Sequence, residues 1–182
     1  MREPAIHDVE IVPYDPAWPS LAELESVRLA GVLGGTLLRI EHVGSTSVPG
    51  LAAKPIIDMI PVVANLDDLD WKRPNVEALG YAWFGEYGIE GRRFCSLDRN
   101  GKRTVHLHVF QQGSPQITRH LAFRNYLRAN PAAARDYETE KHRAAALHPH
   151  DSSAYNREKW DWVARMEATA MDWAGSEPTA NA

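Results

Sequence analysis

The residues best suited to chemistry lie between Leu38 and Val63. An apolar, β-branched run predicts a buried strand there, and a turn of small and hydroxyl residues follows it. Backbone N–H groups in such a turn can bind phosphate, which makes three of its members candidate phosphate-binding residues: Gly44, Ser45 and Thr46. Asp58 is the one charged residue of the apolar run that comes next. Because a carboxylate in such surroundings needs a cation or hydrogen-bond donors, Asp58 is predicted to be a metal ligand and a catalytic residue.

Two histidines offer further metal ligands. His106 and His108 alternate with apolar residues, so both imidazoles leave one face of a predicted strand. If that strand lies beside the strand of Asp58, two imidazoles and a carboxylate form a site that suits zinc, iron or manganese more than magnesium. The alternative is that one histidine packs half-buried and the other faces solvent. His42 and Glu41 point to opposite faces of their strand, so at most one of them enters the site.

Cations near the turn would favour an anionic substrate. Lys54 lies between the turn and Asp58 and is predicted to reach a phosphate and assist catalysis, with an exposed loop lysine as the alternative. Arg92 and Arg93 begin a predicted strand and point to opposite faces, so one could enter the cleft while the other meets water. The guanidinium fork favours phosphate or carboxylate.

The first half of the chain predicts the elements that would position these groups. Asp15-Pro16 predicts the start of a helix that ends at Gly34-Gly35. Its predicted apolar stripe consists of Leu21, Leu24, Val27, Leu29 and Val32. Leu66–Leu79 predicts a helical segment broken by Pro74, and Tyr81–Phe84 a strand. Asn100-Gly101 predicts a hairpin turn between Arg92–Leu97 and Arg103–Phe110.

The second half is predicted to be helical. Breaks at Asn130-Pro131 and at residues 148–151 divide residues 115–173 into three predicted helices. Three pairs of residues are four positions apart, so each pair shares one helical face: Arg124 with Arg128, Tyr137 with Lys141, and Tyr155 with Lys159. Each of these faces is expected to be exposed to solvent. Trp160 is predicted to pack between helices rather than to stack on bases. The whole pattern predicts an α+β fold, a small mixed sheet covered by helices.

Composition limits the classes of function. The 182 residues predict one domain, residues 1–174, with a disordered tail at 175–182. A net charge of −4 and 44% hydrophobic residues give no sign of general binding to nucleic acid or to a membrane. Cys95 is the one cysteine, so an internal disulfide is excluded.

No leader or long apolar run is evident, and a cytoplasmic protein is expected. Oligomeric state is left open, with a homodimer among the alternatives.

Several stretches together resemble the GrpB family, small bacterial proteins of the nucleotidyltransferase superfamily of the DNA polymerase β type. They are VPYDPAWP, RIEHVGSTSVPGLAAKPIID, HLHVF, HLAFRNYLRANP and the Tyr155/Lys159 pair. The resemblance implies a nucleotidyltransferase-like fold with a helical C-terminal region. It adds Arg124 and Lys159 to the candidate phosphate- or nucleotide-binding residues. Gly44, Ser45 and Asp58 match the superfamily pattern, but Ile60 occupies the place of the second carboxylate.

Two functions from different classes follow. One is a metal-dependent nucleotidyltransferase that binds a nucleoside triphosphate or a related phosphorylated small molecule, with a divalent metal (Mg, Mn or Zn). In it, Asp58 and a histidine hold the metal while Lys54 and an arginine neutralise the leaving pyrophosphate. The other is a non-catalytic module, because two-metal transfer needs paired carboxylates. The fusion of GrpB-like domains to dephospho-CoA kinase in some bacteria implies such an accessory role near a nucleotide or coenzyme A. A hydrolase is a weaker third alternative.

Overall fold

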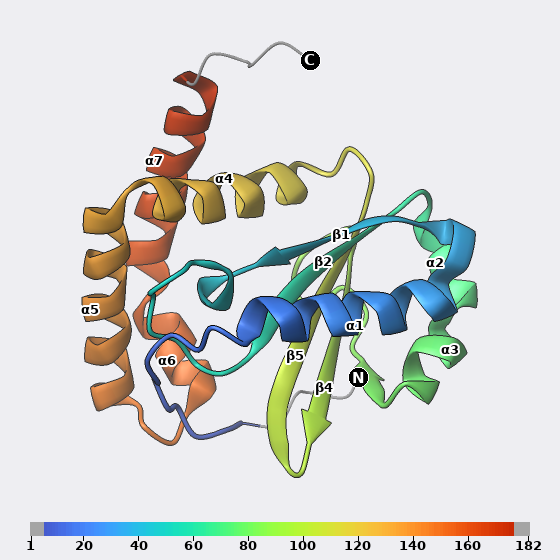
Figure 1. The fold of residues 1–182 in the computed structure, drawn as a ribbon, viewed down its shortest axis with the longest axis horizontal. Coiled ribbons are helices and arrows are strands. Elements are labelled where there is room, and N and C mark those ends of the chain that lie inside the picture. The colour runs from blue at the N-terminus through green and yellow to red at the C-terminus, as the bar shows by residue number, and fades with distance from the viewer. Residues whose placement is uncertain (1–5, 177–182) are drawn as a thin grey trace.

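Five strands form one mixed sheet in the computed structural model of this chain, which describes residues 6–176 (Figure 1). The strands are β1 (Leu37–Val43), β2 (Ile57–Val63), β3 (Tyr81–Trp83), β4 (Arg92–Arg99) and β5 (Lys102–Gln111). Their order is β1-β2-β5-β4-β3, and β2 and β5 are parallel while the other neighbours are antiparallel. The predicted α+β class and small mixed sheet covered by helices are confirmed.

The sheet register brings the two predicted metal-binding strands together. Asp58 of β2 is the partner of His106 on β5, so the condition on which the predicted metal site depends is met. The hairpin between β4 and β5 turns at Asn100 and Gly101, both with positive φ (53° and 75°), which suits the twist of a two-residue hairpin. The superfamily pattern places a Gly-Ser pair at the start of a short helix, followed by a strand that bears an acidic residue. The chain has this arrangement, because Gly44 leads directly into a short 3₁₀ turn, Ser45–Ser47, and β2 follows with Asp58.

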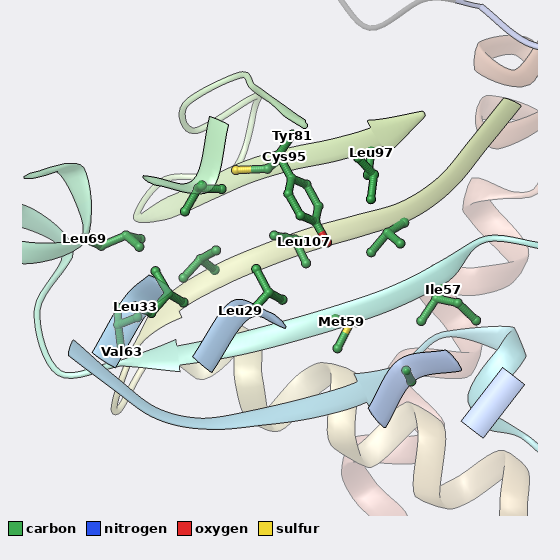
Figure 2. Packing of buried hydrophobic residues seen from close by; sticks show 14 of the residues in the cluster. Leu29, Leu33, Ile57, Met59, Val63, Leu69, Tyr81, Cys95, Leu97 and Leu107 are labelled. Carbon is green, nitrogen blue, oxygen red and sulfur yellow. The ribbon is translucent and has the colours of Figure 1, made fainter. Parts of the chain in front are cut away.

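One face of the sheet is covered by the helices of the N-terminal half, α1 (Trp18–Leu33), α2 (Leu66–Trp71) and α3 (Arg73–Ala78). Leu29 and Leu33 of α1 pack over Met59 and Val63 of β2 (Figure 2). A 3₁₀ turn, Gly34–Thr36, joins α1 to β1. The helical segment broken by Pro74 is confirmed as two helices, with the break at Lys72 because proline is tolerated only in the first turn of α3.

Helix α1 differs from its prediction in two respects. It begins at Trp18, and Asp15 instead accepts a hydrogen bond from the Ala17 N–H in the preceding turn. The predicted apolar stripe is largely wrong, because the buried face consists of Trp18, Ala22, Glu25, Leu29 and Leu33. Leu21, Leu24 and Val27 are exposed. The buried Glu25 is stabilised there by Arg28, Arg99 and the Tyr81 hydroxyl, which the local hydrophobic pattern could not indicate.

Four C-terminal helices cover the other face and one end of the sheet: α4 (Pro115–Ala129), α5 (Pro131–Leu147), α6 (Ser152–Glu158) and α7 (Trp160–Ser176). The prediction of three helices is wrong because the chain also breaks at Lys159, whose N–H bonds back to Arg157 and Tyr155 as α6 ends. Residues 175 and 176 of the predicted tail belong to α7, and residues 177–182 lie outside the described part. Within residues 6–176, no helix has the length and apolar character needed to cross a membrane.

Candidate functional site

A cavity of about 520 Å³ lies where the Gly44 turn and β2 meet the C-terminal helices. Helices α5 and α6 stand beside this end of the sheet (Figure 1). The sheet side contributes the turn, Lys54, Asp58, Arg92 and the two histidines of β5, and the helical side contributes residues of α4, α5, α6 and α7 together with Lys159. The predicted phosphate turn and the predicted metal ligands therefore line one space.

Asp58, His106 and His108 form the chemical centre of this cavity. Their ligand atoms lie within 4.8 Å of one another, and no other such group of three occurs in residues 6–176. Asp58 Oδ1 lies 3.0 Å from His106 Nδ1 and 3.7 Å from His108 Nε2. Burial raises the pKa of Asp58, but the hydrogen bond from His106 and the nearby His108 imidazole outweigh that effect and hold the pKa well below its usual range. Asp58 is therefore an ionised acceptor between two histidines.

The approach of the turn to Asp58 depends on Gly44. A Cβ at this position would lie 2.5 Å from Asp58 Oδ2, closer than any real contact. Gly44 also has φ 69° and ψ −172°, which only glycine adopts readily. The pairing of Val43 with Asp58 across β1 and β2 fixes this proximity. Gly44 is thus required to bring the backbone against the carboxylate.

Two arginines decide where the histidine protons lie. Arg92 Nη1 lies 3.2 Å from His108 Nδ1, and Arg103 Nη1 lies 3.3 Å from His106 Nε2. Since a guanidinium can only donate, each imidazole accepts from an arginine and directs its own N–H toward Asp58. The three residues fit a divalent metal in kind and spacing, but binding one there requires each ring proton to face an arginine instead. Metal binding at this centre therefore requires the arginines to move away.

The structure does not supply a second carboxylate beside Asp58. Ile60 is fully buried in the core beneath α4. Glu41 is the cross-strand partner of Ile60 and shares its face, but Arg124 (3.1 Å) and Arg39 (3.4 Å) hold its carboxylate. Three other carboxylates on nearby segments do not take this place either: Glu86 accepts from the Gly91 N–H, Asp98 pairs with Arg103, and Glu90 is exposed.

Three lysines gather around two tyrosine rings on the helical side of the cavity. Lys54 Nζ lies 4.8 Å from the centroid of Tyr155, and Lys159 Nζ lies 5.3 Å from the same centroid. Lys141 Nζ lies 4.7 Å from the Tyr137 centroid and donates to the Ala52 carbonyl. Burial, with the charge of Lys159 adding to it, lowers the pKa of Lys54 to about 8. Burial likewise lowers the pKa of Lys141 to about 7.

Some predicted site residues do not enter the cavity. Arg93 points away from Arg92 and forms a two-pronged ion pair with Asp70, at 2.7 Å for both contacts. Arg124 binds Glu41 and the His42 carbonyl and does not line the cavity. Thr46 does line the cavity, but its hydroxyl donates to the Ile56 carbonyl and lies 3.0 Å from His42 Nε2, so its oxygen is already used within the protein.

Other functional candidates were missed by sequence reasoning. Tyr137, Lys141 and Tyr155 are buried, so the default of a solvated helical face is wrong for both tyrosine–lysine pairs. Trp160 is not a packing residue, because it is 62% exposed and lines the cavity, as does Tyr87. The repeated Tyr-x-x-x-Lys spacing is the one signal that could have indicated the lysine cluster.

Fold and site together define a small α+β protein with a carboxylate–histidine centre at one end of a mixed sheet. The model of the GrpB family, described as GrpB protein, matches residues 8–169. The crystal structure of conserved protein GrpB from Enterococcus faecalis superposes with a TM-score of 0.87 at 40% identity, covering 92% of this chain and 100% of that one. The chain therefore belongs to the GrpB family, and the predicted resemblance is confirmed.

Some relatives are longer than this chain. The UPF0157 protein YqkA from Bacillus subtilis is 41% identical over 173 residues, which cover 95% of this chain and 50% of YqkA. A protein named dephospho-CoA kinase from Mycobacterium tuberculosis is 30% identical over 199 residues, which cover 95% of this chain and 48% of that protein. The chain thus spans about half the length of both relatives.

Proposed function

We propose that the cavity binds a small phosphorylated molecule, with a nucleotide or a coenzyme A-related compound as the main candidate. The observation that carries this proposal is the cluster of Lys54, Lys141 and Lys159, none of which forms an ion pair within residues 6–176. Three partly buried amines without a carboxylate partner in one cavity favour an anion, which would stabilise their protonated forms. Arg92 adds a guanidinium on the sheet side.

A binding or accessory role has more support than two-metal transfer. Two-metal chemistry needs a second carboxylate next to Asp58, where Ile60 lies in the core and Glu41 is neutralised by Arg124. The similarity to proteins named dephospho-CoA kinase supports the inclusion of coenzyme A and dephospho-CoA among the candidate ligands.

Nucleotidyl transfer with a single divalent metal is the second candidate, favoured by the Asp58–His106–His108 group. These three residues would hold the metal, which would supply Lewis-acid activation of a phosphoryl oxygen. Lys54 and Arg92 would neutralise the charge that develops on the leaving pyrophosphate. Ser45 would orient the phosphates through its backbone N–H.

Calorimetric titration of the metal-free protein with ATP, CTP and coenzyme A tests the proposal. We expect at least one of them to bind, and Lys159→Met to weaken that binding by about tenfold or more, since a charged hydrogen bond to phosphate is lost. Lys102→Met, at the exposed start of β5, is the matched control and should leave the affinity unchanged. Absence of binding, or equal effects of the two substitutions, would contradict the proposal.

The same titrations with manganese or zinc separate the two candidates. If metal strengthens nucleotide binding in the wild type and not in Asp58→Asn, nucleotidyl transfer gains support. If ligand affinity is indifferent to metal and to Asp58, the accessory role gains support.

A further inference from the structure

We propose that Trp160 and Tyr87 form a stacking site for a planar aromatic ring of the ligand, such as a nucleobase. This inference rests on the proposed phosphate-binding function and names the chemistry of the other end of the ligand. It distinguishes a nucleotide-like ligand from a phosphorylated sugar or a simple polyphosphate, which carry no such ring.

Trp160 is the first of the two aromatic groups. It is the first residue of α7, lines the cavity and is 62% exposed. An indole exposed to this extent within a concave site is available to a ligand rather than used in the core. Lys159, at the break between α6 and α7, directly precedes Trp160 in sequence, and both residues line the cavity. A phosphate bound at Lys159 and a ring stacked on Trp160 are therefore compatible with one small molecule.

Tyr87 is the second aromatic group, and the protein holds it firmly in place. Its ring stacks on Phe94, with centroids 5.2 Å apart and planes 17° from parallel, yet Tyr87 stays 43% exposed. Arg92 donates to the Tyr87 carbonyl, and Tyr87 has φ 43°, a conformation that is uncommon for a residue with a side chain. Backbone strain of this kind persists where surrounding contacts enforce it. Phe94 covers one ring face, and Phe84 and the Arg92 guanidinium also lie near the ring, with 6.0 Å between the ring centroids and 5.9 Å from Arg92 Cζ to the Tyr87 centroid. The exposed part of the ring is left for a ligand that enters the cavity.

The combination of cations and exposed rings in one cavity carries the proposal. Aromatic side chains stack on every nucleobase, whereas lysines bind phosphate without regard to the base. Tyr87, Trp160 and the lysine cluster all line the same cavity of about 520 Å³, a volume typical of sites for small molecules. The expected selectivity is therefore for an aromatic ring and not for a particular base.

Titration with inorganic triphosphate and with ATP tests this inference. In the wild type we expect ATP to bind about 5- to 150-fold more tightly than triphosphate, the range for one stacked base. Trp160→Leu should remove most of that preference while leaving the triphosphate affinity unchanged, and Trp160→Phe should restore much of it. Tyr87→Leu should also reduce the preference. Trp71→Leu is the matched control, because Trp71 is 84% exposed on α2 and does not line the cavity.

The outcomes separate this inference from the proposed function. Binding of triphosphate and ATP with equal affinity in the wild type would overturn the stacking site and leave the phosphate site supported. A preference for ATP that survives in Trp160→Leu and Tyr87→Leu would also overturn it. If neither compound binds, the proposed function fails and this inference fails with it.

Discussion

At the scale of single residues, Gly44 has the most restricted position in the site. We predict that Gly44→Ala destabilises the fold more than Gly50→Ala does, although both glycines have positive φ (69° and 79°). At Gly50 an added Cβ meets nothing within 4 Å, so only backbone strain of about 1 kcal/mol is expected. At Gly44 the Cβ also meets the Asp58 carboxylate at 2.5 Å. Urea unfolding of both variants measures the difference, and equal losses would show that the approach to Asp58 is not tight.

Arg92 provides a second prediction at this scale. Because its guanidinium donates to His108 Nδ1, it directs the His108 proton toward Asp58 and opposes a metal there. Arg92→Met should therefore tighten zinc binding in the absence of any phosphorylated ligand, by about tenfold, as expected when one competing charged hydrogen bond is removed. Competition with a chromophoric zinc indicator provides the affinity.

Arg93→Met is the control for that experiment. Arg93 is the neighbouring residue in the chain, but it points to the opposite face and pairs with Asp70, so its replacement should leave zinc affinity unchanged. A similar gain in both variants would indicate a general effect of lost positive charge. No gain in Arg92→Met would mean that the histidine tautomers do not control metal binding.

At the scale of elements, helix α6 positions a large part of the helical side of the cavity. Asp151 caps this helix by accepting from the N–H groups of Ser153 and Ala154, at 2.9 Å each. Tyr155 lies in α6, and Lys159 ends it. The start of α6 and the placement of the lysine cluster are therefore linked through one short helix.

We predict that Asp151→Ala weakens ligand binding, because α6 frays and no longer holds Lys159 at the cavity. The stability loss should be about 1 kcal/mol, as for other caps. Asn65→Ala is the control, since Asn65 caps α2 through two similar bonds and none of the residues of α2 lines the cavity. Both variants should unfold at a lower urea concentration than the wild type, with similar shifts of the midpoint. Only Asp151→Ala should lose affinity in the calorimetric titration with ATP, and equal affinities would contradict the prediction.

At the scale of the whole molecule, stability should fall as the pH decreases below 6.5. Burial lowers the pKa of His42 to about 4 and that of His120 to about 3 from an ordinary value of 6.5. Below pH 6.5 the unfolded chain takes up protons that the folded chain does not. Unfolding is therefore favoured by up to about 1.4 kcal/mol per pH unit for each histidine, until the folded pKa is reached. Above pH 6.5 both states are neutral at these positions and the contribution is fully retained.

Thermal unfolding across this pH range measures the effect. In His120→Gln the melting temperature should fall less steeply as the pH decreases, because one of the buried imidazoles is removed. His142→Gln should keep the wild-type slope, since His142 is exposed on α5. An unchanged slope in His120→Gln would mean that other groups control the acid sensitivity.

Much of the fold was predictable because it is encoded locally. The Asn100-Gly101 hairpin follows from turn chemistry, and the alternation around His106 and His108 gives the face of β5. The glycine, serine and aspartate of the GrpB motif identified the centre of the site. By contrast, the buried face of α1 was mispredicted, since Glu25 satisfies its charge with residues distant in sequence, such as Arg99.

The sequence by itself determined the family, through the motifs that resemble GrpB, and the shared face of His106 and His108, because alternation along one strand is a local property. Only the tertiary structure decided that β5 lies beside β2, which brings both histidines to Asp58. The tertiary structure also decided that Arg92 and not Arg93 faces the cavity, and that Lys141 is buried there while Trp160 stays exposed. The reason is physical. A helix or strand presents two faces with similar local patterns, and packing against segments far away in the chain selects which of them meets the core, the solvent or the cavity.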